Sequence, residues 1–147
     1  MASSSPPGRL KALVQAAPVA AALGAMSLLV HSLGLQRSAS IVWRLADRLP
    51  PPRPNRLEPR PLAEAQARAI GRIADRMPFD ARCLPRALLL AGSLRRRGIA
   101  ADLCLGTRTV GEFDAHAWVE IDGEPVNEPA DLDATYNCLW RRATNSG

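Results

Sequence analysis

The sequence predicts an α+β fold in which helices come first and a small antiparallel sheet follows. Apolar residues recur at helical spacing in the segments that precede Gly98. From Ala100 onward the apolar period changes to two, and the pair Asp122–Gly123 is typical of a tight hairpin turn. A chain of 147 residues with an apolar fraction of 47% has the size and composition of one domain with a buried core.

The N-terminal part is predicted to be helical and then extended. Leu10–Leu33 reads as a largely apolar helix, and Ile41–Arg48 reads as a second helix with Ser38 or Ser40 as its N-cap. The proline-rich segment Leu49–Pro61 excludes a helix and a central strand, so we expect an extended linker there.

An apolar run at Ala17–Val30 follows Arg9 and Lys11, as the core of a signal peptide would. The run is short for a membrane span, and no clear A-x-A cleavage site follows it. We therefore favour a buried helix in a cytoplasmic protein, with export or contact with a membrane surface as the alternative.

Charge is unevenly distributed along the chain. Residues 1–60 carry eight basic and two acidic side chains, a balance of +6, whereas residues 61–147 carry eleven and twelve, a balance of −1. Basic charge is compatible with nucleic acid or an anionic surface. No aromatic residues are interleaved with the arginines and no nucleic-acid-binding motif occurs, so we do not expect a nucleic-acid partner.

The three cysteines are widely spaced, and no C-x-x-C motif occurs. This pattern argues against a disulfide framework and against a zinc site, and it fits free thiols in a reducing compartment. Cys104 and Cys138 are interpreted as structural residues. His31 lies in the apolar N-terminal helix and is interpreted in the same way.

Two further helices are expected before the sheet. Leu62–Met77 has apolar residues at helical spacing, with Pro61 in its first turn. Asp80 is the predicted N-cap of the next helix. That helix ends in three arginines that complement its dipole, and Gly98 suits the left-handed position beyond its last turn.

The remaining segments alternate as strands do. Ala100–Arg108 and Ala115–Ile121 are two predicted strands, and Glu124–Glu128 is the strand that returns after the Asp-Gly turn. Pro125 places the returning strand at an edge or a bulge. A short helix is expected around Thr135–Arg142.

Cys83 lies in the first turn of a predicted helix, where the partial positive charge of the helix favours a thiolate. Arg82 and Arg86 add positive charge, and an imidazole within hydrogen-bond reach, such as that of His116, would complete the activation. The alternative is a small buried thiol, because Cys83 shares a helix face with several leucines.

The residue that orients His116 depends on the hairpin register. A two-residue turn places Ile121 opposite Glu124 and puts Asn127 on the face of His116. A three-residue loop shifts the strand by one residue and puts Glu128 directly across from His116. Both loops accept Asp-Gly, so both residues remain candidates.

These elements together resemble the leader peptidase of lasso-peptide biosynthesis, a small bacterial cysteine protease of the transglutaminase-like, papain-related fold. The resemblance rests on "CLPRALLLAGSLRRRGI" at 83–99 and "AHAWVEIDG" at 115–123, and it covers about residues 62–135 closely. It implies a papain/transglutaminase-like core in which the nucleophile helix packs on a small antiparallel sheet, preceded by N-terminal helices.

The resemblance also implies roles for individual residues. Cys83 matches the nucleophile, His116 the general base, and Glu128 the orienting acid, a position where the family usually has aspartate. That match favours the three-residue loop over the register that presents Asn127. Trp118, on the face of His116, is a candidate wall of the substrate pocket, and no metal or nucleotide cofactor is expected.

The implied reaction is hydrolysis of one peptide bond at the leader–core junction of a ribosomally made precursor. The expected partners are this precursor, a separate leader-recognition protein and an ATP-dependent macrolactam cyclase. On this interpretation residues 1–60 form a helical and linker region that docks a partner, and residues 61–147 form the cysteine peptidase core. The alternatives are transglutaminase-like acyl transfer, amidase action, or a catalytically weak scaffold that binds the leader.

Overall fold

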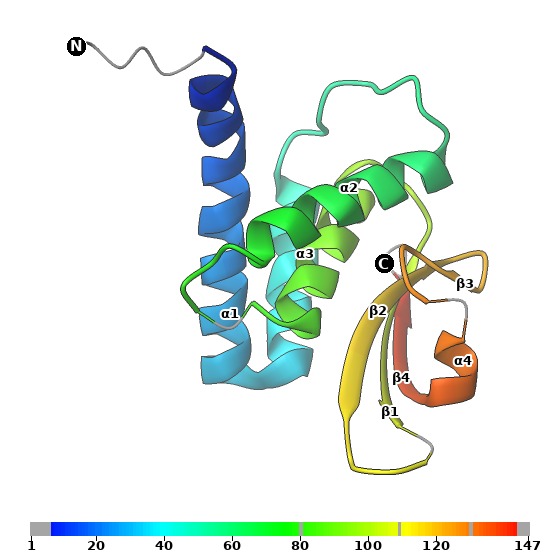
Figure 1. The fold of residues 1–147 in the computed structure, drawn as a ribbon. Helices are drawn as coiled ribbons and strands as arrows, with labels where there is room; N and C mark the ends of the chain where they lie inside the picture. Colours follow the sequence, from blue (N-terminus) through cyan, green and yellow to red (C-terminus); the bar gives the residue numbers. More distant parts are fainter. Residues whose placement is uncertain (1–6, 80, 109, 130, 144–147) are drawn as a thin grey trace.

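The computed structural model describes residues 7–79, 81–108, 110–129 and 131–143, and it confirms the α+β architecture (Figure 1). The three long helices gather on one side of a four-stranded antiparallel sheet with strand order β3-β2-β1-β4. In chain order the elements are α1 (Pro7–Arg48), α2 (Pro59–Ala74), α3 (Cys83–Arg96), β1 (Asp102–Arg108), β2 (Ala115–Ile121), β3 (Glu124–Pro125), α4 (Leu132–Thr135) and β4 (Tyr136–Ala143).

α1 consists of two helices that meet at Gly34, whose φ of 75° breaks the helical path. The two halves run side by side in opposite directions (Figure 1). The prediction that Ser38 or Ser40 caps a second helix is wrong. Both hydroxyls donate instead to carbonyl oxygens four residues earlier, Ser38 to Gly34 at 2.7 Å and Ser40 to Gln36 at 2.9 Å.

The second half of α1 is part of the hydrophobic core. Ala39, Val42 and Trp43 are almost completely buried and belong to the same apolar cluster as Leu88 and Leu94 of α3. This shared core fixes α3 between α1 and the sheet, and it thereby fixes the residue at which α3 begins.

α3 ends as the sequence predicts. Gly98 has a φ of 68°, and the amide of Ile99 donates to the carbonyl oxygen of Leu94 at 3.0 Å, which closes the last turn. At its other end α3 begins at Cys83, with Arg82 in the N-cap position. The predicted cap, Asp80, lies outside the described residues.

The hairpin between β2 and β3 has a two-residue turn. Ile121 pairs with Glu124, and Asp122 and Gly123 have φ values of 53° and 78°. Positive φ at both central residues is the geometry for which Asp-Gly is favoured. The three-residue loop that the resemblance favoured is therefore wrong. The returning strand is also shorter than predicted, because β3 ends at Pro125.

The C-terminal part differs from the prediction of a helix around Thr135–Arg142. A short helix, α4, ends at Thr135, and the next eight residues form β4, which pairs with β1. Half-buried and exposed side chains alternate along β4, a pattern of period two that fits a strand. The partner that satisfies the backbone of β4 is β1, a segment about 30 residues earlier in the sequence.

Gly106 on β1 has no room for a side chain, so we expect Gly106→Ala to destabilise the protein. A Cβ atom there would fall against the backbone carbonyl of Asn137 and 2.9 Å from the Trp118 ring. We expect a loss of about 2–4 kcal/mol in the free energy of unfolding, measured by urea denaturation. Gly24→Ala is the control, because the nearest atom to its Cβ would lie 3.6 Å away. Equal stability of the two variants would contradict this packing.

Candidate active site

A cleft of about 480 Å³ lies between α2, α3 and β2, and it contains the three residues predicted to carry the chemistry. Cys83 enters it from the start of α3, His116 from β2, and Glu128 from the segment after β3. Its remaining lining is small or apolar on one side, with Ala67, Ile70, Gly71, Ala87, Leu90 and Val126, and includes Arg82 and Arg86 at the start of α3.

Cys83 is partly buried at the first position of α3, and its Sγ lies 4.0 Å from the carbonyl oxygen of Ala115 on β2. Burial opposes ionisation of this thiol, but the hydrogen bond with His116 and the backbone amides of Ala117 and Leu84 outweigh it. The net effect holds the pKa of Cys83 below its ordinary value. The site therefore favours the reactive thiolate.

His116 interacts with both of the other residues. Its Nε2 lies 3.0 Å from Oε2 of Glu128. The interaction with Cys83 and that with Glu128 together raise the pKa of His116 to about 9. A histidine of raised pKa beside a cysteine of lowered pKa favours a thiolate–imidazolium pair.

Glu128 reaches the imidazole although the two-residue turn was expected to present Asn127. β3 stops at Pro125, Val126 donates to the carbonyl oxygen of Val119 at 2.8 Å, and Asn127 then adopts a φ of 53°. This left-handed residue redirects the chain and places Glu128 at the histidine. Asn127 lines the cleft, but no hydrogen bond joins it to the imidazole in the described part of the chain.

Trp118 borders the cleft, but it is only 2% exposed. Its Nε1 donates to Oε1 of Glu120 at 2.8 Å, and its ring stacks on that of His116 with centroids 5.9 Å apart. Glu120 is itself bound by Arg141, so the tryptophan is fixed on both sides. Trp118 therefore supports the His116 ring. Because it is almost completely buried, it presents little surface to a substrate.

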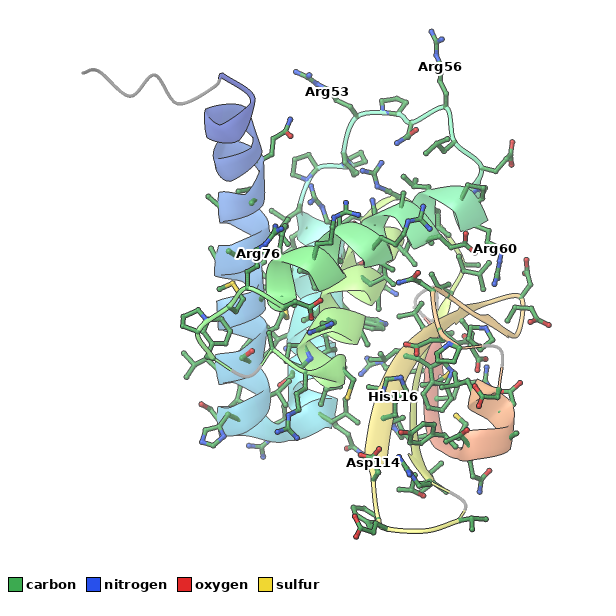
Figure 2. All side chains as sticks on the ribbon, viewed as in Figure 1. Arg53, Arg56, Arg60, Arg76, Asp114 and His116 are labelled. Carbon is green, nitrogen blue, oxygen red and sulfur yellow. The ribbon has the colours of Figure 1, made fainter. Side chains whose placement is uncertain are left out.

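Two residues beside His116 were not singled out as site residues in the sequence. Tyr136 packs its ring 5.2 Å from the imidazole, and Asp114 accepts a hydrogen bond from the Tyr136 hydroxyl at 2.6 Å. Figure 2 shows Asp114 and His116 together at the start of β2. The alternation of side chains from Tyr136 onward indicates a strand. The prediction of a helix there did not place Tyr136 beside His116.

The other residues weighed in the sequence lie away from the cleft. Gln66 lines a separate cavity on the opposite side of α2 and accepts a hydrogen bond from Ser93 at 3.0 Å. Cys104 and Cys138 are free thiols that do not line the cleft; they pack with Trp118, Leu132 and Tyr136 on the sheet face that α4 covers. His31 is exposed on α1.

Comparison with known proteins supports what this geometry indicates. A family model described as the transglutaminase-like superfamily matches residues 25–141. The chain belongs to the transglutaminase-like superfamily. The match begins within α1 and ends in β4, so it includes every element of the cleft. No curated protein and no solved structure matches the chain.

Membership of the transglutaminase-like superfamily and the geometry of the cleft point to the same class of chemistry. A thiolate at a helix start attacks an acyl carbon, and the neighbouring imidazolium supplies a proton to the leaving group. The function is therefore of the cysteine-protease or acyltransferase type.

The thiolate–imidazolium pair sets the expected pH dependence of this chemistry. The value of kcat/KM should rise as Cys83 ionises at a pH below the ordinary range of a thiol, and it should fall as His116 loses its proton near pH 9. The measurement is kcat/KM from about pH 5 to pH 10. An alkaline limb near the ordinary histidine value of 6.5 would contradict the pair.

Proposed function

We propose that this protein is a cysteine peptidase that removes the leader from a ribosomally synthesised lasso-peptide precursor. Cleavage frees the α-amine of the core peptide, which a separate ATP-dependent cyclase then uses to form a macrolactam. The observation that carries the proposal is the arrangement of Cys83, His116 and Glu128 in one cleft. The choice of substrate rests on the resemblance of segments 83–99 and 115–123 to that peptidase family.

The mechanism follows from the positions of the three residues. The Cys83 thiolate attacks the carbonyl carbon at the leader–core junction, and the backbone amide of Cys83 at the start of α3 stabilises the oxyanion. His116 gives its proton to the leaving amine, so the C–N bond breaks and a thioester remains. His116 then takes a proton from water as the water attacks the thioester, which releases the leader as an acid and restores the thiolate.

The proposed partner-docking region includes an apolar groove of about 440 Å³ formed by α1, α2 and α3. Leu45 and Leu49 lie at this groove and are 48% and 50% exposed. Arg96 lines the groove, and Arg53 and Arg56 project from the linker between α1 and α2 (Figure 2). Apolar area with basic residues around it fits a partner surface that is apolar and acidic, which we assign to the leader-recognition protein.

We place the protein in the cytoplasm, where the precursor would be made and where free thiols persist. One helical segment, Gln15–Arg48, is long and apolar enough to cross a membrane by length and composition alone; its apolar 18-residue window has a mean hydropathy of 1.6, and only 6% of that window is buried. Its second half is packed into the core, whereas in the apolar run Ala17–Val30 only Leu23 is buried, so the prediction of a buried helix there is wrong. Recovery of the protein in the membrane fraction of disrupted cells would contradict this location.

Mass spectrometry of a short precursor encoded beside this chain tests the function. Hydrolysis gives two fragments whose summed mass exceeds the precursor by one water, whereas acyl transfer joins the leader to an added amine. The reaction is run with and without the leader-recognition protein, and Ala69→Glu in the groove should remove the stimulation by that protein. The matched control is Ala65→Glu, one turn earlier on α2 and outside the groove lining. An intact precursor under all conditions would overturn the proposal.

A further inference from the structure

The rings of Trp118 and Tyr136 both pack against the imidazole of His116. The His116 ring lies 5.9 Å from Trp118 and 5.2 Å from Tyr136, and the two larger rings are 6.5 Å apart. Trp118 stacks at an interplanar angle of 17°, whereas Tyr136 is tilted by 37°. The imidazole is therefore restrained by contacts with two neighbouring rings in addition to the hydrogen bond that Glu128 makes at its edge.

Tyr136 is itself held in place through Asp114. The Tyr136 hydroxyl donates to Oδ2 of Asp114 at 2.6 Å, and Arg108 donates to the same oxygen at 3.3 Å. The Arg108 guanidinium also lies 6.0 Å from the centre of the Tyr136 ring. These contacts join the end of β1, the residue before β2 and the first residue of β4 at one place. They close the end of the sheet on which His116 lies.

The hydrogen bond from Tyr136 is the main cause that lowers the pKa of Asp114, and the positive charges of Arg108 and His116 act in the same direction. Because the interaction between two charges is mutual, the Asp114 carboxylate also favours the charged form of His116. Asp114 is 48% exposed, so water screens much of this effect.

We propose that Asp114 and Tyr136 are positioning residues for His116. Tyr136 restrains the imidazole ring, and Asp114 fixes Tyr136 while it adds a second carboxylate beside the imidazolium. The inference deepens the proposed function, but it rests on that function only through the Cys83–His116 pair. Its test therefore needs no peptide substrate and can fail independently of the proposed peptidase activity.

The charged and titratable groups that face His116 come from several elements. Cys83 faces it from α3 and Glu128 from the segment after β3, while Asp114, Arg108 and Tyr136 close the end of the sheet. Glu128 contacts the imidazole directly, so it has the larger effect on the titration. The contribution of Asp114 is smaller and must be measured with Glu128 intact.

The test is an NMR titration of the imidazole nitrogens in the full-length protein. The chain has two histidines, so His31, exposed on α1, serves as an internal reference. The His116 midpoint should lie near 9 in the wild type. We expect Asp114→Asn to lower that midpoint by about half a pH unit and Asp114→Glu to restore most of it. Tyr136→Phe, which removes the hydrogen bond from Tyr136 to Asp114, should also lower it.

The second measurement is the rate at which iodoacetamide alkylates Cys83 at pH 7, followed by peptide mapping so that the other thiols do not interfere. We expect Tyr136→Phe to slow alkylation by about threefold, because a less restrained imidazolium stabilises the thiolate less well. Asp122→Asn is the matched control for the loss of one carboxylate, since Asp122 lies in the turn at the opposite end of β2.

The outcomes separate positioning from a merely structural role. If the His116 midpoint and the alkylation rate stay at wild-type values while only the melting temperature falls, the proposal is overturned. A shift in Tyr136→Phe without any shift in Asp114→Asn would overturn the assignment of Asp114. If Asp122→Asn and Asp114→Asn shifted the His116 midpoint equally, the shift would come from the net charge of the protein alone. That result would also overturn the proposal.

Discussion

Replacing Cys83 with alanine is expected to lower peptide hydrolysis by more than about 10⁴-fold, because the nucleophile is lost and the rest of the site cannot replace it. The fold should persist. Cys83 is only partly buried at the first position of α3, and alanine is a good helix former there. The measurement is the single-turnover rate of precursor cleavage by mass spectrometry, alongside a circular-dichroism spectrum of the variant.

Cys138→Ala is the matched control for this experiment. Cys138 is also a free and partly buried thiol, but it does not line the cleft and packs against the cluster of Cys104, Trp118 and Leu132. Its loss should change the rate by less than about twofold. Cleavage by Cys83→Ala at the wild-type rate would refute the assignment of the nucleophile. Full loss in both variants would point to damage of the fold.

The helical half of the fold could be predicted because its signals are local. The end of α3 is an example: three arginines, Gly98 and Ile99 specify a closed last turn, and the structure has it. The way in which the two halves of α1 join was harder to predict from the sequence. The chain reverses at Gly34, and the serines beyond it bond back to carbonyls, so the local cap signals there were misleading.

The C-terminal strand could not be predicted in the same way. The segment 136–143 contains residues that tolerate either a helix or a strand, and its conformation is decided by pairing with β1. The error had a consequence for the site, because Tyr136 is the first residue of that strand and contacts His116 only through this pairing. The alternation from Tyr136 onward indicates a strand, but no local signal shows that this strand brings Tyr136 to His116, because the pairing with β1 decides it.

The hairpin is an example of one wrong inference, the three-residue loop, drawn beside two features that the structure has. The Asp-Gly pair does form the two-residue turn, as one of the two registers considered for the sequence required. The resemblance placed Glu128 at the histidine and so favoured the other register. Both features hold in the structure, because Asn127 adopts a φ of 53° after a strand of only two residues. Alternation along an ideal strand could not show that change of direction.

Glu128→Gln is expected to lower the kcat of hydrolysis by about 100-fold, with a smaller effect on KM. The amide keeps the size of the side chain but removes the charge that stabilises the imidazolium at 3.0 Å. Because Glu128 is one of the causes that raise the pKa of His116, its loss should also move the alkaline limb of kcat/KM below pH 9. Glu128→Asp keeps the charge on a shorter side chain and should give an intermediate rate. The measurement is kcat and KM over the pH range given above.

Substitutions at Asn127 determine whether its backbone or its side chain matters for orienting His116. If the backbone matters, Asn127→Gly should retain nearly full activity, because glycine adopts a φ of 53° without strain. Asn127→Val should lose about tenfold, because a β-branched residue resists that conformation and displaces Glu128. If Asn127→Gly instead lost as much activity as Glu128→Gln, the Asn127 side chain would be an orienting group. The role of Glu128 would then be limited to its charge.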